Sequence, residues 1–196
     1  TMYSNLVPFS ERLGLTGDDV IAMASPMAHQ TGFMYGLLMP IYLKARFILF
    51  DTWDKQVKGQ MVQDDGITFT MASTPFLMDL TAAIGDHKFD SRSLRIFLCA
   101  GAPIPGAVVE RARAVMPTTK VVSAWGMTEN GAVTVVDPND DDERSINTDG
   151  FALPGMEIQI RDEHGNTCKP GEQGERHRAD QVELLAGGQQ RTRGGE

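Results

Sequence analysis

Hydrophobic residues along the chain fall into short continuous runs and longer periodic segments, and the two kinds alternate. Short runs rich in β-branched and aromatic residues predict buried strands, whereas an apolar residue at every third or fourth position predicts a helix. Strands are predicted at residues 20–24, 45–50, 67–72, 94–100 and 121–125. Helices are predicted at residues 4–13, about 30–43, about 54–64, from 74 onward and 104–116. The alternation predicts an α/β fold, a doubly wound and mostly parallel sheet with helices on both faces.

Three of these helices carry more specific signals. Ser4 is the predicted N-cap of the first helix, because its hydroxyl can accept a bond from an unpaired backbone N–H. The segment at about 30–43 is apolar nearly all round, which predicts a buried helix. The helix that starts at Thr74 has Pro75 in its first turn, where the missing N–H does no harm.

The pattern changes after residue 131. Short strands are predicted at residues 132–136 and 156–161, with a hairpin-type turn at 162–166. These strands predict the edge of a second, antiparallel β unit. From residue 176 to 196 apolar residues are few, so this tail cannot bury enough surface to offset its ordering entropy, and we predict that it is disordered.

Composition and charge narrow the class of protein. The chain has 196 residues, enough for one domain, and its 41% hydrophobic and 22% charged residues are ordinary for a soluble globular protein. Its 18 basic and 26 acidic residues give a net charge of −8, which argues against a nucleic-acid or anionic-membrane binder. The acidic run at 137–143 is predicted to be a solvated loop.

Cysteine usage and the apolar runs bear on the compartment. Cys99 and Cys168 lie far apart without metal-ligand spacing, and Cys99 is predicted to be a small buried hydrophobe. The first residues lack the layout of a signal peptide. The longest apolar run, at 32–43, is too short to span a membrane and contains Pro40. Together these features predict a cytoplasmic location.

The strand at 121–125 carries the most specific chemistry. It ends at Gly126, and Thr128 and Glu129 follow directly. The carboxyl ends of parallel strands are where open α/β sheets bind ligands. Thr128 can offer a hydroxyl to a phosphate, and Glu129 offers the oxygen ligands that Mg²⁺ prefers. This spacing alone also fits an ordinary exit from a strand into a loop.

The residue types in this segment are more informative than their spacing. Trp125-Gly126-Met127-Thr128-Glu129 closely resembles the aromatic-Gly-Met-Thr-Glu signature of the adenylate-forming (AMP-binding) superfamily. That superfamily includes acyl-CoA synthetases, adenylation domains of peptide synthetases, and luciferases. Three further segments match it in the same order: Pro26-Met27-Ala28-His29, Leu98-Cys99-Ala100-Gly101-Ala102-Pro103 and Gly171-Glu172-Gln173-Gly174-Glu175. The resemblance covers about residues 1–175.

The resemblance implies a reaction in two steps and a domain division. A carboxylate attacks the α-phosphate of ATP to give an acyl-adenylate and pyrophosphate, and a thiol, usually coenzyme A, then takes the acyl group. Residues 1–136 would be the α/β core, part of the family's N-terminal domain. Residues 137–175 would be a loop and the start of its small β-barrel subdomain. The atypical tail at 176–196 departs abruptly from the family pattern, and a shifted reading frame is one hypothesis for it.

The resemblance also implies roles for individual residues in nucleotide binding. The small residues Gly101, Ala102 and Pro103 would pack against one face of adenine, since only a bare backbone can approach a flat base. Trp125 would cover the opposite face; without the residues around it, a core tryptophan would be the better interpretation. Thr128 would hold the α-phosphate and Glu129 the Mg²⁺ ion. Gly126 and Met127 would belong to the same nucleotide site.

On the acyl side, the resemblance implies a pocket for a small or medium carboxylic acid. His29 would lie at this pocket and change position between the two half-reactions. Two other features are expected to line the pocket together with Gly126 and Met127, namely Phe33 and the turn formed by Thr74 and Pro75.

Parts of the family's machinery have no counterpart in the sequence. A Gly-rich Ser/Thr/Lys phosphate loop, which the family places just before residue 1, does not occur, and no ribose-binding Thr-Gly-Asp or late lysine follows the matching segments. We therefore expect a central fragment, inactive alone, whose partners are ATP, coenzyme A, a carboxylic acid and the missing N- and C-terminal parts, not nucleic acid. Three alternatives stay open: an adenylation domain that loads a carrier protein, a non-catalytic nucleotide- or acyl-binding module, and a doubly wound domain that binds no nucleotide.

Overall fold

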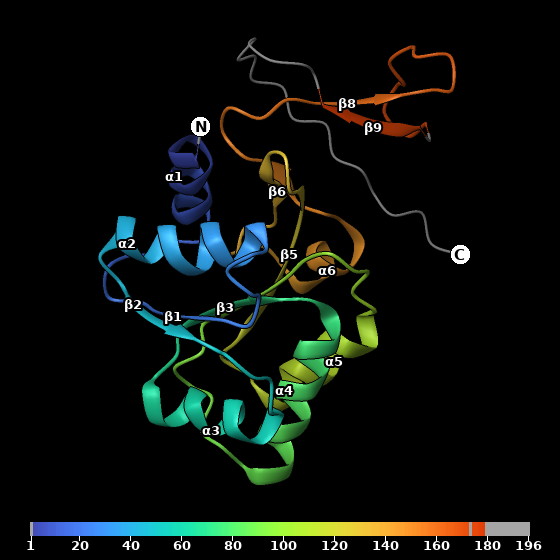
Figure 1. Ribbon diagram of the computed structural model, residues 1–196. Coiled ribbons are helices and arrows are strands. Elements are labelled where there is room, and N and C mark those ends of the chain that lie inside the picture. Colours follow the sequence, from blue (N-terminus) through green and yellow to red (C-terminus); the bar gives the residue numbers. More distant parts are fainter. Residues whose placement is uncertain (1, 173, 179–196) are drawn as a thin grey trace.

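A seven-stranded sheet is the centre of the molecule (Figure 1). The computed structural model describes residues 2–172 and 174–178 of the chain. The strand order is β2-β1-β3-β4-β5-β6-β7, in which the first five pair in parallel and the last two join antiparallel. The strands are β1 Val20–Met23, β2 Arg46–Leu49, β3 Phe69–Ala72, β4 Ile96–Cys99, β5 Lys120–Met127, β6 Gly131–Val135 and β7 Phe151–Ala152. The predicted mostly parallel sheet is confirmed.

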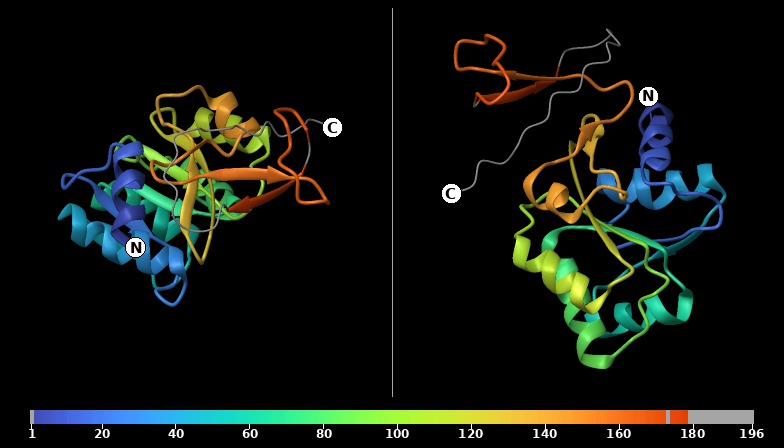
Figure 2. Two further views of the ribbon diagram at one scale, coloured as in Figure 1. Left: turned by 90° about the horizontal axis from the view of Figure 1, so that it is seen from above. Right: turned by 180° about the vertical axis from the view of Figure 1, so that it is seen from behind.

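Helices cover both faces of this sheet (Figures 1 and 2), as predicted. One face carries α1 Met2–Arg12, the π-helical segment η1 Gly32–Leu38 and α2 Met39–Leu43. The other carries α3 Lys55–Asp65, α4 Thr74–His87, α5 Gly106–Val115 and the short α6 Asp142–Asn147. Each predicted helix is present, and Pro75 lies at the start of α4 where it was expected.

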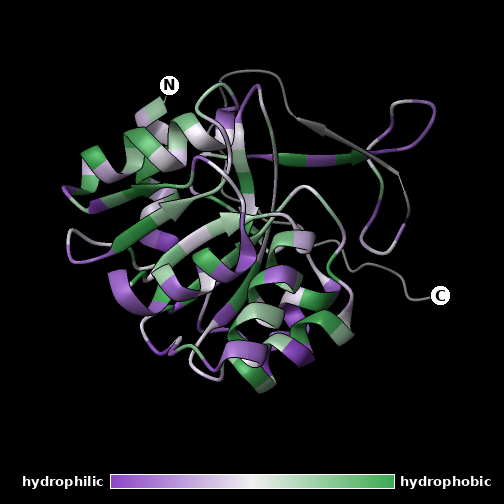
Figure 3. Cartoon of the chain, turned by 60° about the horizontal axis from the view of Figure 1, so that its bottom comes forward, coloured by the Kyte–Doolittle hydropathy of each residue, from purple (hydrophilic) through white to green (hydrophobic). Residues whose placement is uncertain are grey.

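The central strands are buried on both sides, which explains their continuous apolar runs. In β4, Ile96 and Leu98 pack in the core beneath α1 and η1, whereas Phe97 and Cys99 pack in the core beneath α3, α4 and α5. Successive side chains of a strand point to opposite faces, so a strand covered on both faces needs apolar residues at every position. In Figure 3 the central strands are mainly hydrophobic, whereas the helices mix hydrophobic and hydrophilic residues.

Two predictions about the first face need correction. The helix α1 begins at Met2, so Ser4 lies within its first turn and is not its N-cap. The segment at 30–43 is helical as η1 and α2, but it is not buried on all sides. Ile41 is 64% exposed, and the exposed ring of Tyr42 meets Tyr3 edge-on at 5.7 Å between ring centres. The reason is that only one side of this helical segment packs on the sheet.

The strand β5 does not end at Gly126, contrary to prediction. It continues to Met127 because β6 supplies antiparallel partners, with Gly126 opposite Ala132 and Met127 opposite Gly131. The register shifts between Trp125 and Gly126. Thr128 and Glu129 therefore lie in the tight turn of a β5–β6 hairpin. The strand predicted at 132–136 belongs to the main sheet and not to a second β unit.

A separate two-stranded antiparallel sheet follows the main sheet in the chain. It pairs β8 Ile158–Arg161 with β9 Glu175–Arg178 and lies apart from the seven-stranded sheet (Figures 1 and 2). The predicted turn at 162–166 is present and directly follows β8. In it, hydrogen bonds from Asn166 hold the pKa of the Asp162 carboxyl below its usual range. Disorder was predicted from residue 176, but 176–178 are paired in β9. The rest of that prediction, 179–196, lies outside the described residues.

The acidic run at 137–143 is only partly a loop. Its second half starts α6, where the Asp141 carboxylate accepts a hydrogen bond from the Arg144 backbone N–H as the N-cap. Asp142 lies in the first turn, 3.3 Å from Arg113 and 3.6 Å from Lys120. Carboxylates are stabilised at a helix N-terminus, because the unpaired backbone N–H groups there carry partial positive charge. The second half of the run therefore forms the start of a helix.

Two smaller predictions concern Cys99 and membrane spans. Cys99 is 1% exposed in β4, so its predicted role as a small buried hydrophobe is confirmed. Burial raises the pKa of its thiol to about 12. Within 2–172 and 174–178, every helix falls short of the length and apolar character that crossing a bilayer requires.

Candidate functional site

A large cavity opens at the carboxyl edge of the parallel strands. Its volume is about 950 Å³, and its walls include the segments that follow β1, β3 and β4 and the end of β5. Each strand ends there in small or polar residues, such as Ser25 after β1 and Ser73 after β3. This is the edge where open α/β sheets place their ligands. A cavity of this size can hold a cofactor-sized molecule.

The turn Gly101-Ala102-Pro103 forms one wall. It follows β4 directly, and the hydroxyl of Thr74 in α4 donates to the Pro103 carbonyl at 2.9 Å, which ties the turn to the helix. Gly101 has a φ of +79°, a conformation that residues with a side chain rarely adopt, and no heavy atom lies within 4 Å of the place where its β-carbon would be. A flat ligand can therefore approach the backbone closely here.

The β5–β6 hairpin forms a second wall. Because β4 and β5 are neighbours, with Cys99 opposite Ser123, the turn after β4 and the last residues of β5 meet at one edge. Trp125, Gly126, Met127 and Thr128 line the cavity in succession, and Trp125 is half-buried. The structure thus brings the segments predicted to enclose a purine into one cavity.

Glu129 lies one residue beyond this wall. It is exposed at the tip of the hairpin turn and does not line the cavity. Within the part of the chain that the structure describes, no group of three or more His, Cys, Asp or Glu residues could hold a metal ion. A divalent ion at this place would have Glu129 as a protein carboxylate ligand, with its other oxygens from phosphate and water. That donor set fits Mg²⁺, which is commonly bound through one or two carboxylates plus substrate phosphates.

His29 reaches the cavity from the loop between β1 and η1. It is exposed, and its Nδ1 accepts a hydrogen bond from the Thr31 backbone N–H at 3.1 Å. With Nδ1 an acceptor, the neutral ring carries its proton on Nε2. The imidazole can therefore donate from Nε2 to an oxygen atom in the cavity.

Several residues at the cavity were not indicated by any sequence motif. Tyr35, Met71 and Phe76 add apolar surface, and Asp149, 8% exposed, adds a carboxylate from the segment before β7. They come from four separate elements, so no local spacing marks them. Phe33 does not line the cavity. The predicted Thr74–Pro75 turn does not either, but its neighbours Ser73 and Phe76 do, so the motif was one residue from the correct positions.

Tyr35 lines the cavity and has a strongly shifted pKa. Burial raises the pKa of its phenol to about 12, an effect that the hydrogen bond from the Ala132 backbone N–H partly opposes. The hydroxyl also donates to Oδ1 of Asn5 at 2.6 Å. It therefore stays protonated throughout the physiological range.

A Thr-Gly-Asp triplet does occur in the chain, at residues 16–18, but it lies away from this site. It precedes β1 and so stands at the amino edge of the sheet, opposite the cavity. The adjoining Asp19 is buried, and Arg95 binds its carboxylate at 2.7 Å. This edge is a structural ion-pair site and adds nothing to the cavity.

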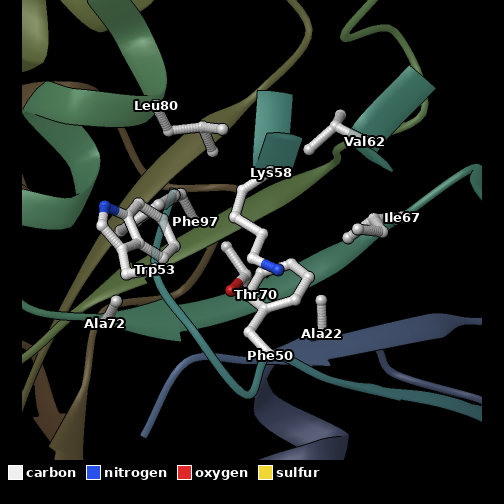
Figure 4. Close-up of a pocket in the computed structure, with 10 residues that line it drawn as sticks. All are labelled: Ala22, Phe50, Trp53, Lys58, Val62, Ile67, Thr70, Ala72, Leu80 and Phe97. Atoms are coloured by element: carbon white, nitrogen blue, oxygen red, sulfur yellow. The ribbon is translucent and has the colours of Figure 1, made fainter. Parts of the chain in front are cut away.

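A second, much smaller cavity lies between α3 and the sheet (Figure 4). Its volume is about 10 Å³, enough for one water molecule. The buried side chain of Lys58 enters it, and Nζ lies 4.6 Å from the ring centre of Phe50. On its rim, Trp53 Nε1 donates to the Asp79 carboxylate at 3.0 Å. This cavity is too small for a substrate.

Sequence comparisons identify the family to which the chain belongs. The profile of the family described as AMP-binding enzyme matches residues 1–185. The chain is 34% identical over 167 residues to a medium-chain fatty-acid–CoA ligase of Escherichia coli. The aligned part is 85% of this chain and 29% of that protein. It is 29% identical over 149 residues to a 3-[(3aS,4S,7aS)-7a-methyl-1,5-dioxo-octahydro-1H-inden-4-yl]propanoyl:CoA ligase of Rhodococcus jostii, covering 76% of this chain and 29% of that protein. The chain thus spans less than a third of these relatives.

Solved structures share the fold. An O-succinylbenzoate coenzyme A synthetase of Bacillus subtilis, in complex with ATP and a magnesium ion, superposes with a TM-score of 0.79 at 24% identity, covering 89% of this chain and 35% of that chain. The crystal structure of VinN superposes with a TM-score of 0.80 at 22% identity, covering 89% and 43%. At these identities the likeness shows a common fold.

Proposed function

The chain belongs to the AMP-binding enzyme family, and from this premise we propose that it is part of an ATP-dependent carboxylate–CoA ligase that works through an acyl-adenylate. One observation carries the proposal. The cavity at the carboxyl edge of the sheet is lined by Trp125, by the bare turn Gly101-Ala102-Pro103 and by Thr128. An aromatic ring and a small-residue turn suit the two faces of a purine, and a hydroxyl suits its phosphate.

Adenine recognition would come from these two walls. Base–aromatic stacking depends on a flat, accessible ring, and Trp125 is half-buried at the cavity rather than enclosed in the core. On the other side, Gly101 keeps the backbone clear of side-chain atoms. The nucleotide would thus be held by surfaces from two adjacent strands.

Phosphate activation would depend on the hairpin turn. Thr128 would donate to an α-phosphate oxygen, and Glu129, exposed beside it, would ligate Mg²⁺. When bound, the ion supplies positive charge to the phosphate oxygens, which lowers the barrier to attack by a carboxylate. The attack forms the acyl-adenylate and expels pyrophosphate, and the CoA thiol then displaces AMP to give the thioester.

The acid would lie in the remaining part of the cavity. Met71 and Phe76 offer apolar surface to a carbon chain or ring, and His29 could donate from Nε2 to a carboxyl or carbonyl oxygen. The mixture of apolar and polar lining suits a small or medium carboxylic acid. The 34% identity to a medium-chain fatty-acid–CoA ligase supports the same size class.

The 196-residue chain alone would not catalyse the reaction. The chain covers 29% of its ligase relatives, and the phosphate loop and late lysine of the superfamily have no counterpart in its sequence. Since positive charge near the transferring phosphate supplies much of the catalysis in such reactions, loss of these parts should remove most of the rate. The isolated chain would retain part of the nucleotide-binding surface.

Pyrophosphate release tests the proposal directly. The full-length protein, meaning the proposed ligase of which this chain is a part, is incubated with ATP, Mg²⁺ and a panel of aliphatic and aromatic acids. Coenzyme A consumption is measured in parallel. Acid-dependent pyrophosphate release together with loss of free CoA thiol is expected. Pyrophosphate release without CoA loss, but with loading of a carrier protein, would identify an adenylation domain instead. Nucleotide binding with no release for any acid would identify a non-catalytic binding module.

A further inference from the structure

The turn that carries Thr128 and Glu129 is held from outside the hairpin by two buried side chains. Asn5 in α1 donates from Nδ2 to the Ala132 carbonyl at 2.7 Å and to the Asn130 carbonyl at 3.2 Å. Tyr35 in η1 accepts from the Ala132 backbone N–H at 2.7 Å. The two side chains bond to each other at 2.6 Å. Three segments far apart in sequence therefore meet in one closed network.

This network leaves little freedom at the base of the turn. Asn5 is 3% and Tyr35 1% exposed, and the Phe9 ring packs 4.3 Å from the Tyr35 ring, centre to centre. Buried hydrogen bonds of this kind are held firmly, because breaking one leaves polar atoms without water. Gly131 marks how close the contact is, since a β-carbon there would lie 2.7 Å from Asn5 Oδ1 and its φ is +72°.

The protonation state of Tyr35 keeps the network in one arrangement. A hydroxyl can donate to Asn5 and accept from Ala132 at the same time only while it is protonated. Its raised pKa maintains that state across the physiological range. The groups that hydrogen-bond to this hydroxyl are the Asn5 side chain, the Ala132 backbone N–H and the Gln30 side chain, and all three are uncharged.

Tyr35 also lines the large cavity, so the network joins the cavity wall to the turn. We propose that Asn5 and Tyr35 are positioning residues, which hold the Thr128–Glu129 turn in the position relative to the cavity that phosphate binding requires. The inference rests on the proposed function, in which this turn holds the α-phosphate and Mg²⁺. It predicts that the two residues affect the phosphate end of the nucleotide and not its adenine end.

The test compares ligands that differ only in phosphate. Tyr35→Phe removes the hydroxyl and keeps the ring that packs on Phe9. Asn5→Asp keeps the size and an acceptor for Tyr35, but loses the two N–H donors to the turn. Tyr42→Phe, on the exposed side of α2, is the matched control. In the full-length protein we would measure Kd for adenosine, AMP and ATP with Mg²⁺, and kcat and KM for pyrophosphate release.

In Tyr35→Phe and Asn5→Asp, kcat should fall by about 10- to 100-fold, since misplacement of a reacting group by about 1 Å can cost 100-fold. AMP and ATP should bind more weakly, while the Kd for adenosine changes less than about twofold and Tyr42→Phe behaves as wild type. Equal weakening of adenosine and AMP, or an unchanged kcat in both variants, would overturn the inference. If Tyr35→Phe does not fold, Asn5→Asp alone decides between these outcomes.

Failure of the proposed function would look different. In that case the wild-type protein would release no pyrophosphate with any acid and would not prefer AMP to adenosine. A wild type that does both, with variants that lose neither, would leave the proposed function in place and reject only the positioning role.

Discussion

Trp125 and Ala102 line the same cavity, although the helix α5 and most of β5 separate them along the chain. Parallel pairing of β4 with β5 accounts for this, since it aligns Cys99 with Ser123 and so brings the residues that follow each of them to one edge. A cleft between an indole and a backbone turn follows from strand order rather than from any local motif. Four predictions follow from this arrangement and from the buried groups around it.

Trp125→Ala should weaken AMP binding by about 10- to 100-fold, because stacking of a base on an aromatic ring is worth about 1–3 kcal/mol. Calorimetric titration of the full-length protein with AMP measures the effect. Trp53→Phe is the control, since Trp53 lies by the small cavity beneath α3 and bonds Asp79. Unchanged AMP affinity in Trp125→Ala would mean that the indole is only a packing residue.

Glu129→Gln should lower the rate of pyrophosphate release by about 100-fold and raise the Mg²⁺ concentration needed for half the maximal rate. The amide keeps the size of the side chain and removes the charge that attracts the ion. Glu143→Gln, an exposed carboxylate in the first turn of α6, is the matched control. An identical Mg²⁺ dependence in wild type and Glu129→Gln would exclude Glu129 as a metal ligand.

Lys58→Met should raise the free energy of unfolding by about 1 kcal/mol, because a buried charge without an opposite charge is less favourable than an apolar side chain of similar size. Lys58 is 6% exposed, and among the described residues it forms no ion pair within 4.0 Å. Chemical denaturation measures the change, with the exposed Lys55→Met as control. Destabilisation instead would show that the contact with the Phe50 ring outweighs the desolvation of the ammonium.

Cys99 should resist alkylation in the folded protein at about pH 9, where an ordinary cysteine is half ionised. Its pKa of about 12 reflects burial, so the folded state binds the proton more tightly than the unfolded state, and the free energy of unfolding falls as the pH rises above 9.0. Mass spectrometry after iodoacetamide treatment should find the label only in denaturant. Cys99→Ala should flatten the decline in stability above pH 9.0; rapid native labelling would contradict the burial.

Some features were predictable because their physical cause is local. The apolar runs predicted both ends of β1, β3 and β4 to within two residues, since a strand covered on both faces needs a hydrophobic residue at each position. The signature from Trp125 to Glu129 and the turn from Gly101 to Pro103 predicted segments that do meet at one cavity. The roles of Thr128, Glu129 and His29 remain predictions.

Other features could not be predicted because their cause is a distant partner. Gly126 is a strand breaker in local terms, yet it is paired in β5 because Ala132 faces it across the hairpin. Asp149 reaches the cavity only because the chain returns after α6 to pair β7 with β6. Neither fact is contained in a window of neighbouring residues.

The sequence by itself determined the class of fold, the order of its strands and helices, and the family, since hydrophobic periodicity and short motifs depend on neighbouring residues. The tertiary structure alone decided which segments share one cavity, that Thr128 and Glu129 lie on a hairpin turn, and that Asn5 and Tyr35 hold its base. The physical reason is the separation in sequence between the residues that interact. A buried hydrogen bond between residues 5, 35 and 132 forms only after the sheet has brought three segments together, so no local pattern encodes it.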